Sequence, residues 1–376
     1  MNPTRLFAAA VGIFMAVSAA SAQELVVKVG HAGPLSGNQA VAGKDNERGV
    51  RLALDDLNAK DFRIGGKRAR FVLDSEDDQG DPKTGVVVAQ KFVDSGVRVV
   101  IGHYNSGVSI PASRIYSDAG IPMISGASSN PKLTKQGFAS IFRLAANDNV
   151  MGAAMAEFAA ARGLKKVAVI DDRTAYGTGV VEIFEQTAAK LGLEVVGHEY
   201  TTDKATDFTP ILTSLKGKSP EAVFLGGYYA QAATLARQMK QLGVPGLLLG
   251  GDGICTNEVI ALGASQMEGR YFCAQGGEAL DTLTGGPAFR ERFKRTFNAD
   301  VDAYAPAFYV ATLAVAQAMQ AAGTDDPAKV VPALKALKMD SMLGPIAFDS
   351  TGEWIKAPVT IYQISGAKLA PMPRKW

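Results

Sequence analysis

Residues 101–134 read IGHYNSGVSIPASRIYSDAGIPMISGASSNPKLT, and this stretch predicts the fold of the chain. An apolar, β-branched run at 97–101 predicts a strand, and a helical pattern follows over 106–116. A second strand, predicted at 121–124, leads into a turn of small residues at 125–130. Strands and helices that alternate at this spacing indicate right-handed βαβ units in a parallel sheet.

Both turns of this stretch are rich in serine and glycine and follow the carboxyl end of a strand, where open α/β sheets bind ligands. Ser106 begins the predicted helix, so free backbone N–H groups and the helix dipole would favour an anion there. Ser128 and Ser129 add hydroxyls and further N–H groups in the second turn. Because neither turn contains Lys or Arg, the pattern indicates one small carboxylate rather than a triphosphate.

The stretch resembles the periplasmic branched-chain amino-acid binding proteins of ABC transporters, which have the two-lobed type I fold. The resemblance is carried by GHYNSGVSIPAS, IPMIS and ASSNPKLT, and continues through AYGTG, GGYYAQAATLARQM, GGDGI and SMLGPIAFDSTGEW. It implies a periplasmic solute-binding protein that catalyses no reaction and needs no cofactor or metal. Such a protein delivers a free amino acid to an inner-membrane ABC permease, and we expect a monomer.

The strand–helix pattern starts again after residue 150, which predicts an α/β fold with two doubly wound parallel-sheet lobes. Three helical segments near the carboxyl end, 287–297, 305–322 and 326–337, have no strands between them and must cover an existing sheet. The resemblance places these helices on the first lobe and the final strands on the second.

The predicted domain organisation follows from this assignment. Lobe one, which would bind the carboxylate, comprises residues 23–147 and 277–352, and lobe two, which would close over the ammonium, comprises 148–276 and 353–376. Three crossings near Asn147, Gln275 and Gly352 would form a hinge, and a few such loop residues suffice for rigid closure around a ligand.

Composition and the amino terminus limit the function further. A chain of 376 residues is too long for one typical core, and 39 basic against 37 acidic residues argue against a nucleic-acid partner. Residues 1–22 have the weakly basic start, the apolar segment and the Ala-Ser-Ala end of a signal peptide. We expect export to the periplasm and cleavage after Ala22.

The chain has two cysteines, Cys255 and Cys273. An even number in an oxidising compartment suggests a disulfide, and two buried free thiols are the alternative. Their spacing does not resemble a zinc site.

Other motifs point away from catalysis. The segment GNQAVAGK at 37–44 misses the P-loop pattern, since five residues separate its glycines and Asp45 follows. The signatures GxSxG, HExxH and GxGxxG are absent from the sequence. His31, His103 and His198 lie far apart in the chain, which favours packing or capping roles.

Asp252 follows an apolar strand of the second half in a glycine-rich turn, where its carboxylate could pair with a ligand's ammonium. A turn-forming aspartate in GDG is the alternative. The resemblance favours the ligand role, with Ala127 contributing its carbonyl oxygen. The ligand's carboxylate would then be held by Ser106 and Ser129 in the first lobe.

Five further positions are candidates because the resemblance implies that they line the cleft. Aromatic rings give a ligand apolar walls and a polar handle, although each ring taken singly could equally belong to the core. The positions are Tyr104, Asn105, Tyr176, Tyr228 and Tyr304.

The ligand's identity is open at this point. Asp252 stands where the family usually has Glu, Ala42 where it has an aromatic residue, and Tyr104 where it has a smaller aliphatic one. Leu, Ile and Val are the first choice, ahead of Ala, Pro or γ-aminobutyrate. An amide- or amino-acid-sensing regulator and an exported amidase are alternatives from other functional classes.

Overall fold

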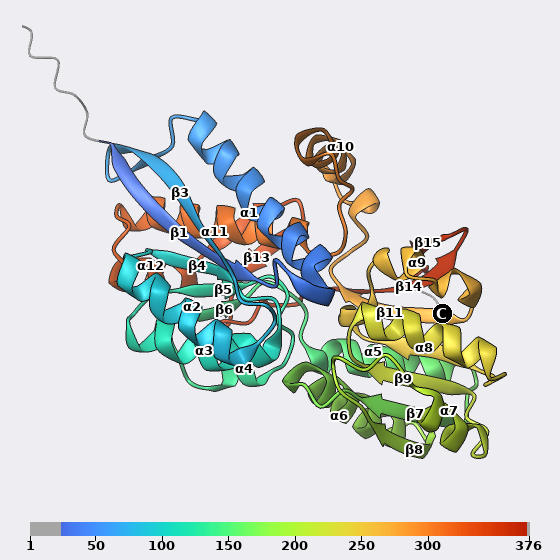
Figure 1. Ribbon diagram of the computed structural model, residues 1–376. Helices are drawn as coiled ribbons and strands as arrows, with labels where there is room; N and C mark the ends of the chain where they lie inside the picture. Colours follow the sequence, from blue (N-terminus) through green and yellow to red (C-terminus); the bar gives the residue numbers. More distant parts are fainter. Residues whose placement is uncertain (1–23, 374–376) are drawn as a thin grey trace, which may run out of the picture.

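The computed structural model describes residues 24–373 and arranges them in two α/β lobes (Figure 1). The predicted signal peptide and its cleavage after Ala22 lie outside the described residues. Within 24–373 no helix is both long enough and apolar enough to cross a membrane.

The first lobe is built on a sheet that has the order β2-β3-β1-β4-β5-β6 within the described residues. Its pairings are parallel except at the edge, where β2 runs antiparallel to β3. The strands are β1 (Leu25–Gly33), β2 (Arg63–Ile64), β3 (Lys67–Asp77), β4 (Val99–Gly102), β5 (Met123–Ser125) and β6 (Ile141–Arg143).

Helices cover this sheet with two separate apolar cores. One core includes α1 and α11, which pack against each other, and the other includes α2 and α3 (Figure 1). The helices of this lobe are α1 (Ala40–Ala59), α2 (Pro82–Ser95), α3 (Ser106–Asp118), α4 (Lys132–Lys135), α10 (Gly286–Phe297), α11 (Ala305–Ala322) and α12 (Pro327–Lys335). The late helices therefore lack a large sheet of their own, as the sequence predicts.

Local sequence explains where these helices begin and end. Asp81 caps α2 by accepting a 2.8 Å hydrogen bond from the backbone N–H of Thr84, and Pro82 occupies the first turn, where its fixed φ is compatible with a helix. Gly96 ends the helix with φ of 72°, a left-handed conformation that favours glycine.

The second lobe is built on a sheet of order β15-β14-β11-β10-β9-β7-β8 within the described residues. The strands from β11 to β8 pair in parallel, and β14 and β15 add an antiparallel edge. The strands are β7 (Lys166–Asp171), β8 (Glu194–Tyr200), β9 (Ala222–Gly226), β10 (Leu247–Gly250), β11 (Tyr271–Gly276), β14 (Val359–Ser365) and β15 (Lys368–Pro371).

Helices α5 and α6 pack together in this lobe, as do α7 and α8 (Figure 1). The helices are α5 (Asp148–Ala161), α6 (Ala175–Lys190), α7 (Thr209–Lys216), α8 (Tyr229–Gln241) and α9 (Glu258–Ala261). A two-stranded sheet of β12 (Lys338–Ser341) and β13 (Gly344–Ala347) completes the described part of the chain.

The chain passes between the sheets at three places. It leaves the first sheet after β6, leaves the second after β11, and returns to the second sheet between β13 and β14. Arg143 at the end of β6 forms a parallel bridge with Glu353, so two of these passages lie side by side. The residue boundaries given above for the lobes and the hinge stay predictions.

Cys255 and Cys273 form a disulfide with a Cα–Cα distance of 5.4 Å. The bond joins the turn after β10 to β11, across a sequence separation of 18 residues. The bridge, rather than a pair of free thiols, is therefore present in the structure.

We expect thiol titration of the oxidised, denatured protein to find no free cysteine. Replacing both Cys255 and Cys273 with Ala should lower the free energy of unfolding by about 3 kcal/mol, because the unfolded chain loses its constraint. Two titratable thiols in the untreated protein would contradict the bridge.

Candidate ligand site between the two lobes

A small cavity lies where the two lobes meet, with a volume of about 10 Å³. Such a volume is about the space of one water molecule. The first lobe contributes the turns after β4 and β5, the start of α3 and the residue that precedes α11, and the second contributes the first turn of α6 and the turns after β9 and β10. The lining residues are Tyr104, Ser106, Ala127, Ser129, Tyr176, Tyr228, Asp252, Gly253 and Tyr304.

Hydrogen bonds across the cleft show that the lobes are closed on each other. The side-chain amide of Asn130 donates to the carbonyl oxygen of Ala175 at 2.5 Å, linking the turn after β5 to the start of α6. The backbone N–H of Asn257 donates to the carboxylate of Asp302 at 3.1 Å. The small cavity therefore belongs to a closed arrangement.

Ser106 begins α3, as predicted, and its side chain is buried. Its hydroxyl oxygen accepts a hydrogen bond from the backbone N–H of Asn130 at 3.1 Å. Because the oxygen is held as an acceptor, the hydroxyl proton is left to donate. A donor of this kind at the first turn of a helix suits a carboxylate.

The turn that carries Ala127 and Ser129 is held in place by hydrogen bonds to Ser125 and to Arg143. The hydroxyl oxygen of Ser125 accepts the backbone N–H groups of Ala127 at 3.2 Å and Ser128 at 2.9 Å. The guanidinium group of Arg143 also holds this turn, because it donates to the carbonyl oxygens of Ser128 at 2.6 Å and Asn130 at 2.9 Å.

Arg143 is fully buried and forms an ion pair with Glu353 at 2.6 Å. The sequence reasoning did not single out this arginine. The signal was present, since Arg143 is a lone charge in an otherwise apolar strand segment, 141–144, and a buried charge requires a partner.

Asp252 is buried directly after β10, in a short helical turn of residues Asp252–Ile254. Burial raises the pKa of its carboxyl to about 6, opposed first by the nearby hydroxyl of Tyr176. Its Oδ1 atom has no hydrogen-bond partner within the described residues. A buried acceptor with a free oxygen is suited to a cationic donor such as an ammonium.

Four tyrosines enclose the cavity. The ring centroids of Tyr104 and Tyr304 are 5.2 Å apart, those of Tyr176 and Tyr228 are 5.2 Å apart, and those of Tyr104 and Tyr228 are 6.0 Å apart. These rings provide apolar walls. The hydroxyl of Tyr104 has no hydrogen-bond partner among residues 24–373.

Two predicted site residues do not line the cavity. The side-chain amide of Asn105 donates to Gln39 at 2.6 Å, and the hydroxyl of Ser128 donates to the carbonyl oxygen of Tyr104 at 2.9 Å. Both residues lie one layer behind the cavity wall and support the loop that carries Tyr104 and Ser106.

Asp148 is a second residue that the sequence reasoning missed. It is the first residue of α5, it is fully buried, and its backbone N–H donates to the carbonyl oxygen of Ser129 at 2.9 Å. Burial, and after it the nearby charge of Asp252, raises the pKa of its carboxyl to about 8. With this pKa the carboxyl of Asp148 keeps its proton at neutral pH, so it can donate a hydrogen bond near the ionised carboxylate of Asp252.

The three histidines do not line the small cavity. His103 is buried with one ring nitrogen 2.7 Å from Asp78 and the other 2.9 Å from the hydroxyl of Tyr116, and His31 contacts the carbonyl oxygen of Ile101 at 2.8 Å. His198 pairs with Glu185 on the second lobe. Within the described residues no group of His, Cys, Asp and Glu is arranged to hold a metal ion.

Comparisons with known proteins agree with this architecture. The model of the periplasmic binding protein family matches residues 26–368. A Leu/Ile/Val-binding protein homologue of Brucella melitensis is 31% identical over 369 residues, covering 96% of each chain. An amino acid binding protein of Pseudomonas aeruginosa is 30% identical over 360 residues, covering 95% of each chain.

Among solved structures, a leucine binding protein of Thermotoga maritima superposes with a TM-score of 0.85 at 25% identity. The alignment covers 92% of this chain and 98% of that one. The two-lobed α/β fold is therefore that of transport solute-binding proteins.

Proposed function

The chain belongs to the periplasmic binding protein family, and from this premise we propose that it is the solute-binding protein of an ABC transporter. It holds a free neutral amino acid between its lobes and delivers it to an inner-membrane permease. Leu, Ile and Val are the first choice of ligand, supported by the names of the Brucella and Thermotoga relatives. Ala, Pro and γ-aminobutyrate are the second choice.

One observation carries this proposal. The buried carboxylate of Asp252, from the second lobe, lines the same cavity as the hydroxyls of Ser106 and Ser129, from the first lobe. An α-amino acid carries an ammonium and a carboxylate, which match an acceptor on one wall and donors on the other. The carbonyl oxygen of Ala127 is a further acceptor for the ammonium.

The division of these groups between the lobes explains how binding is coupled to closure. A buried charge without a partner costs several kcal/mol, so both ends of the zwitterion must be paired inside the cavity. Only the closed form offers partners for both ends. The ligand therefore favours closure through its higher affinity for the closed state, and the permease recognises the closed shape.

We further propose that the protein acts as a periplasmic monomer after cleavage at Ala22 and that no bond is made or broken. An amidase would need a His–Asp pair to activate Ser106, and none of the described residues that line the cavity is a histidine. A sensing regulator on the same fold would usually lack a signal peptide, so an uncleaved cytoplasmic product found by mass spectrometry would favour the regulator.

A thermal-shift screen of the twenty amino acids and γ-aminobutyrate tests the proposal. A ligand at 100 times its Kd stabilises the folded state by about 2.7 kcal/mol through mass action. We expect Leu, Ile or Val to give the largest increase in melting temperature. A screen in which no amino acid raises it would contradict the function.

The substitution Tyr104→Leu should shift preference toward larger side chains. The ring of Tyr104 occupies the cavity between Tyr228 and Tyr304, so its removal leaves space for a ligand. Calorimetric titration should find the ratio of leucine affinity to alanine affinity raised by about tenfold. If the order of ligands is unaltered, Tyr104 does not limit the size of the ligand.

Binding should weaken as the pH falls below about 6. Burial in the closed arrangement raises the pKa of Asp252 to about 6, and only its ionised form can pair with an ammonium. Below that pH the ligand must displace a proton, so affinity should drop by about tenfold per pH unit. Titrations at pH 5 and pH 7.5 with equal affinity would rule out this pairing.

A further inference from the structure

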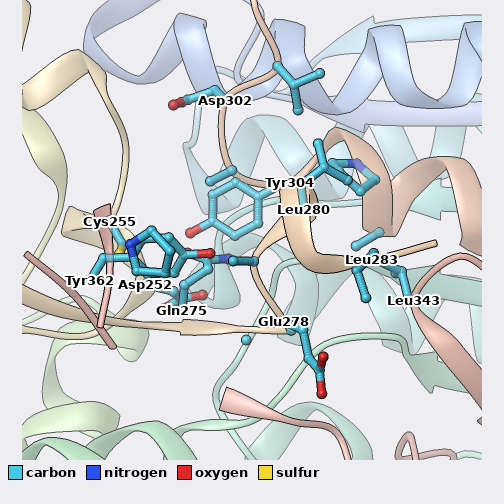
Figure 2. Close-up of a pocket in the computed structure, with 18 of the residues that line it drawn as sticks. Asp252, Cys255, Gln275, Glu278, Leu280, Leu283, Asp302, Tyr304, Leu343 and Tyr362 are labelled. Carbon is cyan, nitrogen blue, oxygen red and sulfur yellow. The ribbon is translucent and has the colours of Figure 1, made fainter. Parts of the chain in front are cut away.

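The buried carboxyl group of Asp148 lies next to the turn that carries Ser129, but it lines neither of the two cavities in this region. The second cavity, of about 410 Å³, shares Asp252 and Tyr304 with the small one (Figure 2). Asp148 is fully buried, and its two carboxyl oxygens have no hydrogen-bond partner among the described residues. A buried polar group without a partner is costly, so its presence requires a reason.

Capping of a helix does not supply that reason. Asp148 is the first residue of α5, where a carboxylate usually accepts free backbone N–H groups. Its oxygens accept none of these groups within residues 24–373. Helix α6 packs against the carboxyl instead, since a Cβ atom added to Gly179 would lie 3.2 Å from Asp148 Oδ2. The carboxyl is therefore enclosed between two helices, where its charged form is poorly stabilised.

The charges nearest to Asp148 also oppose its ionisation. Burial and the carboxylates of Asp252 and Glu353 raise its pKa, which is about 8, while the hydroxyl of Ser129 and the charge of Arg143 act in the opposite direction. Arg143 is already paired with Glu353 at 2.6 Å. Asp148 is consequently neutral at pH 7.

The other elements that pack against α5 add little charge. They are α6 and the strands β10, β11 and β14, and the strands contain no Asp, Glu, His, Lys or Arg. On α6, Tyr176 interacts with the charge of Asp148, whereas Glu185 pairs with His198. The remaining titratable side chains on these elements are the exposed Glu182 and Lys190, together with Tyr271 and Tyr362.

Asp148 contacts the ligand-binding turn through Ser129. Its backbone N–H donates to the carbonyl oxygen of Ser129 at 2.9 Å, and the hydroxyl of Ser129 lies near enough to the carboxyl to lower its pKa. A serine hydroxyl has one proton. It can therefore donate to the ligand's carboxylate or to an ionised Asp148, but not to both.

We propose that Asp148 is a positioning residue whose neutral carboxyl leaves the hydroxyl of Ser129 available to the ligand's carboxylate. When Asp148 loses its proton, that hydroxyl donates to Asp148 instead, and a second negative charge lies behind the place of the ligand's carboxylate. Binding is then tightest where Asp252 is ionised and Asp148 is neutral, between about pH 6 and pH 8. This inference rests on the proposed function.

The substitution Asp148→Asn tests the inference, because the amide is neutral at every pH used. Leucine, alanine, proline and γ-aminobutyrate are titrated calorimetrically into wild type at pH 7, and the tightest ligand is then titrated into both proteins at pH 7 and pH 9. We expect the wild-type Kd to increase about tenfold more than the variant's Kd between these pH values. The ligand's ammonium and Asp302, whose pKa is also about 8, titrate in both proteins, so their effects cancel in the comparison.

Glu157→Gln removes an exposed carboxylate of the same helix and should follow the wild-type pH dependence. Asp148→Ser replaces Asp148→Asn if circular dichroism finds that variant unfolded. The same pH dependence in wild type and the neutral variant would overturn the inference, as would a wild-type affinity that rises toward pH 9 relative to the variant. Wild-type protein that binds none of the four ligands at pH 7 would instead remove the proposed function.

Discussion

Replacing Asp252 with Asn should weaken amino-acid binding by about 2–5 kcal/mol, the usual loss when one partner of a buried charge pair is removed. The amide has nearly the shape of the carboxylate, so the cavity should keep its form. The ligand's ammonium would then be buried without a counter-charge. Calorimetric titration at pH 7.5 measures the loss, because Asp252, with a pKa of about 6, is ionised at that pH in wild type.

The control for this substitution is Asp207→Asn, which changes an exposed carboxylate on the same lobe. Its affinity should equal that of wild type. An Asp252→Asn variant that also binds with wild-type affinity would remove Asp252 from the ligand site.

Replacing Arg143 with Met should lower the free energy of unfolding by about 3–5 kcal/mol, as expected when one member of a buried ion pair is lost. The substitution leaves the carboxylate of Glu353 without its cation and removes the donors that hold the carbonyl oxygens of Ser128 and Asn130. Because this turn carries Ser129, ligand affinity should fall as well. Urea denaturation monitored by circular dichroism measures the change.

Arg290→Met is the matched control, since Arg290 forms a comparably short ion pair with an exposed aspartate, Asp281. Exposed pairs contribute about 0–1 kcal/mol, so little should change. The double substitution Arg143→Met and Glu353→Leu should recover part of the lost stability, because no unpaired charge remains. A single Arg143→Met variant within about 1 kcal/mol of wild type would contradict the assigned role.

Long periodic segments were the part of the fold that the sequence could predict. The helix expected at 305–322 matches α11 (Ala305–Ala322), because its apolar residues repeat over many turns. Helix α6 begins at Ala175, about a turn and a half before its apolar pattern. Its first residues, AYGTG, resemble a loop, yet the hydroxyl of Thr174 caps the helix by accepting the N–H of Gly177 at 2.9 Å.

Three short strands could not be predicted. They are edge strands or members of a two-stranded sheet, and they contain charged residues or proline, so they show no apolar alternation. These segments form strands because they pair with a strand that is distant in the sequence or with one across a tight turn. They are β2 (Arg63–Ile64), β12 (Lys338–Ser341) and β15 (Lys368–Pro371).

Some residues of the candidate site could be predicted from the sequence, and others could not. Ser106 could be predicted because it follows a strand in a turn rich in serine and glycine, whereas the ligand role of Asp252 was favoured by the family resemblance over a turn-forming role. The contributions of Arg143 and Asp148 depend on burial, which a single sequence does not reveal. A neighbouring cavity of about 410 Å³ could not be predicted from the sequence, since its wall joins Gly126, Tyr304 and Pro371, which are far apart in the chain.

The central claim is that one amino acid contacts both lobes at the same time. The most direct test of this claim is a crystal structure of the protein with leucine, in which two distances are measured. We predict that the ligand's nitrogen lies about 2.7–3.2 Å from the Asp252 carboxylate and its carboxylate equally close to the hydroxyls of Ser106 and Ser129. A leucine that contacts one lobe alone, or whose carboxylate faces Asp252, would contradict the account.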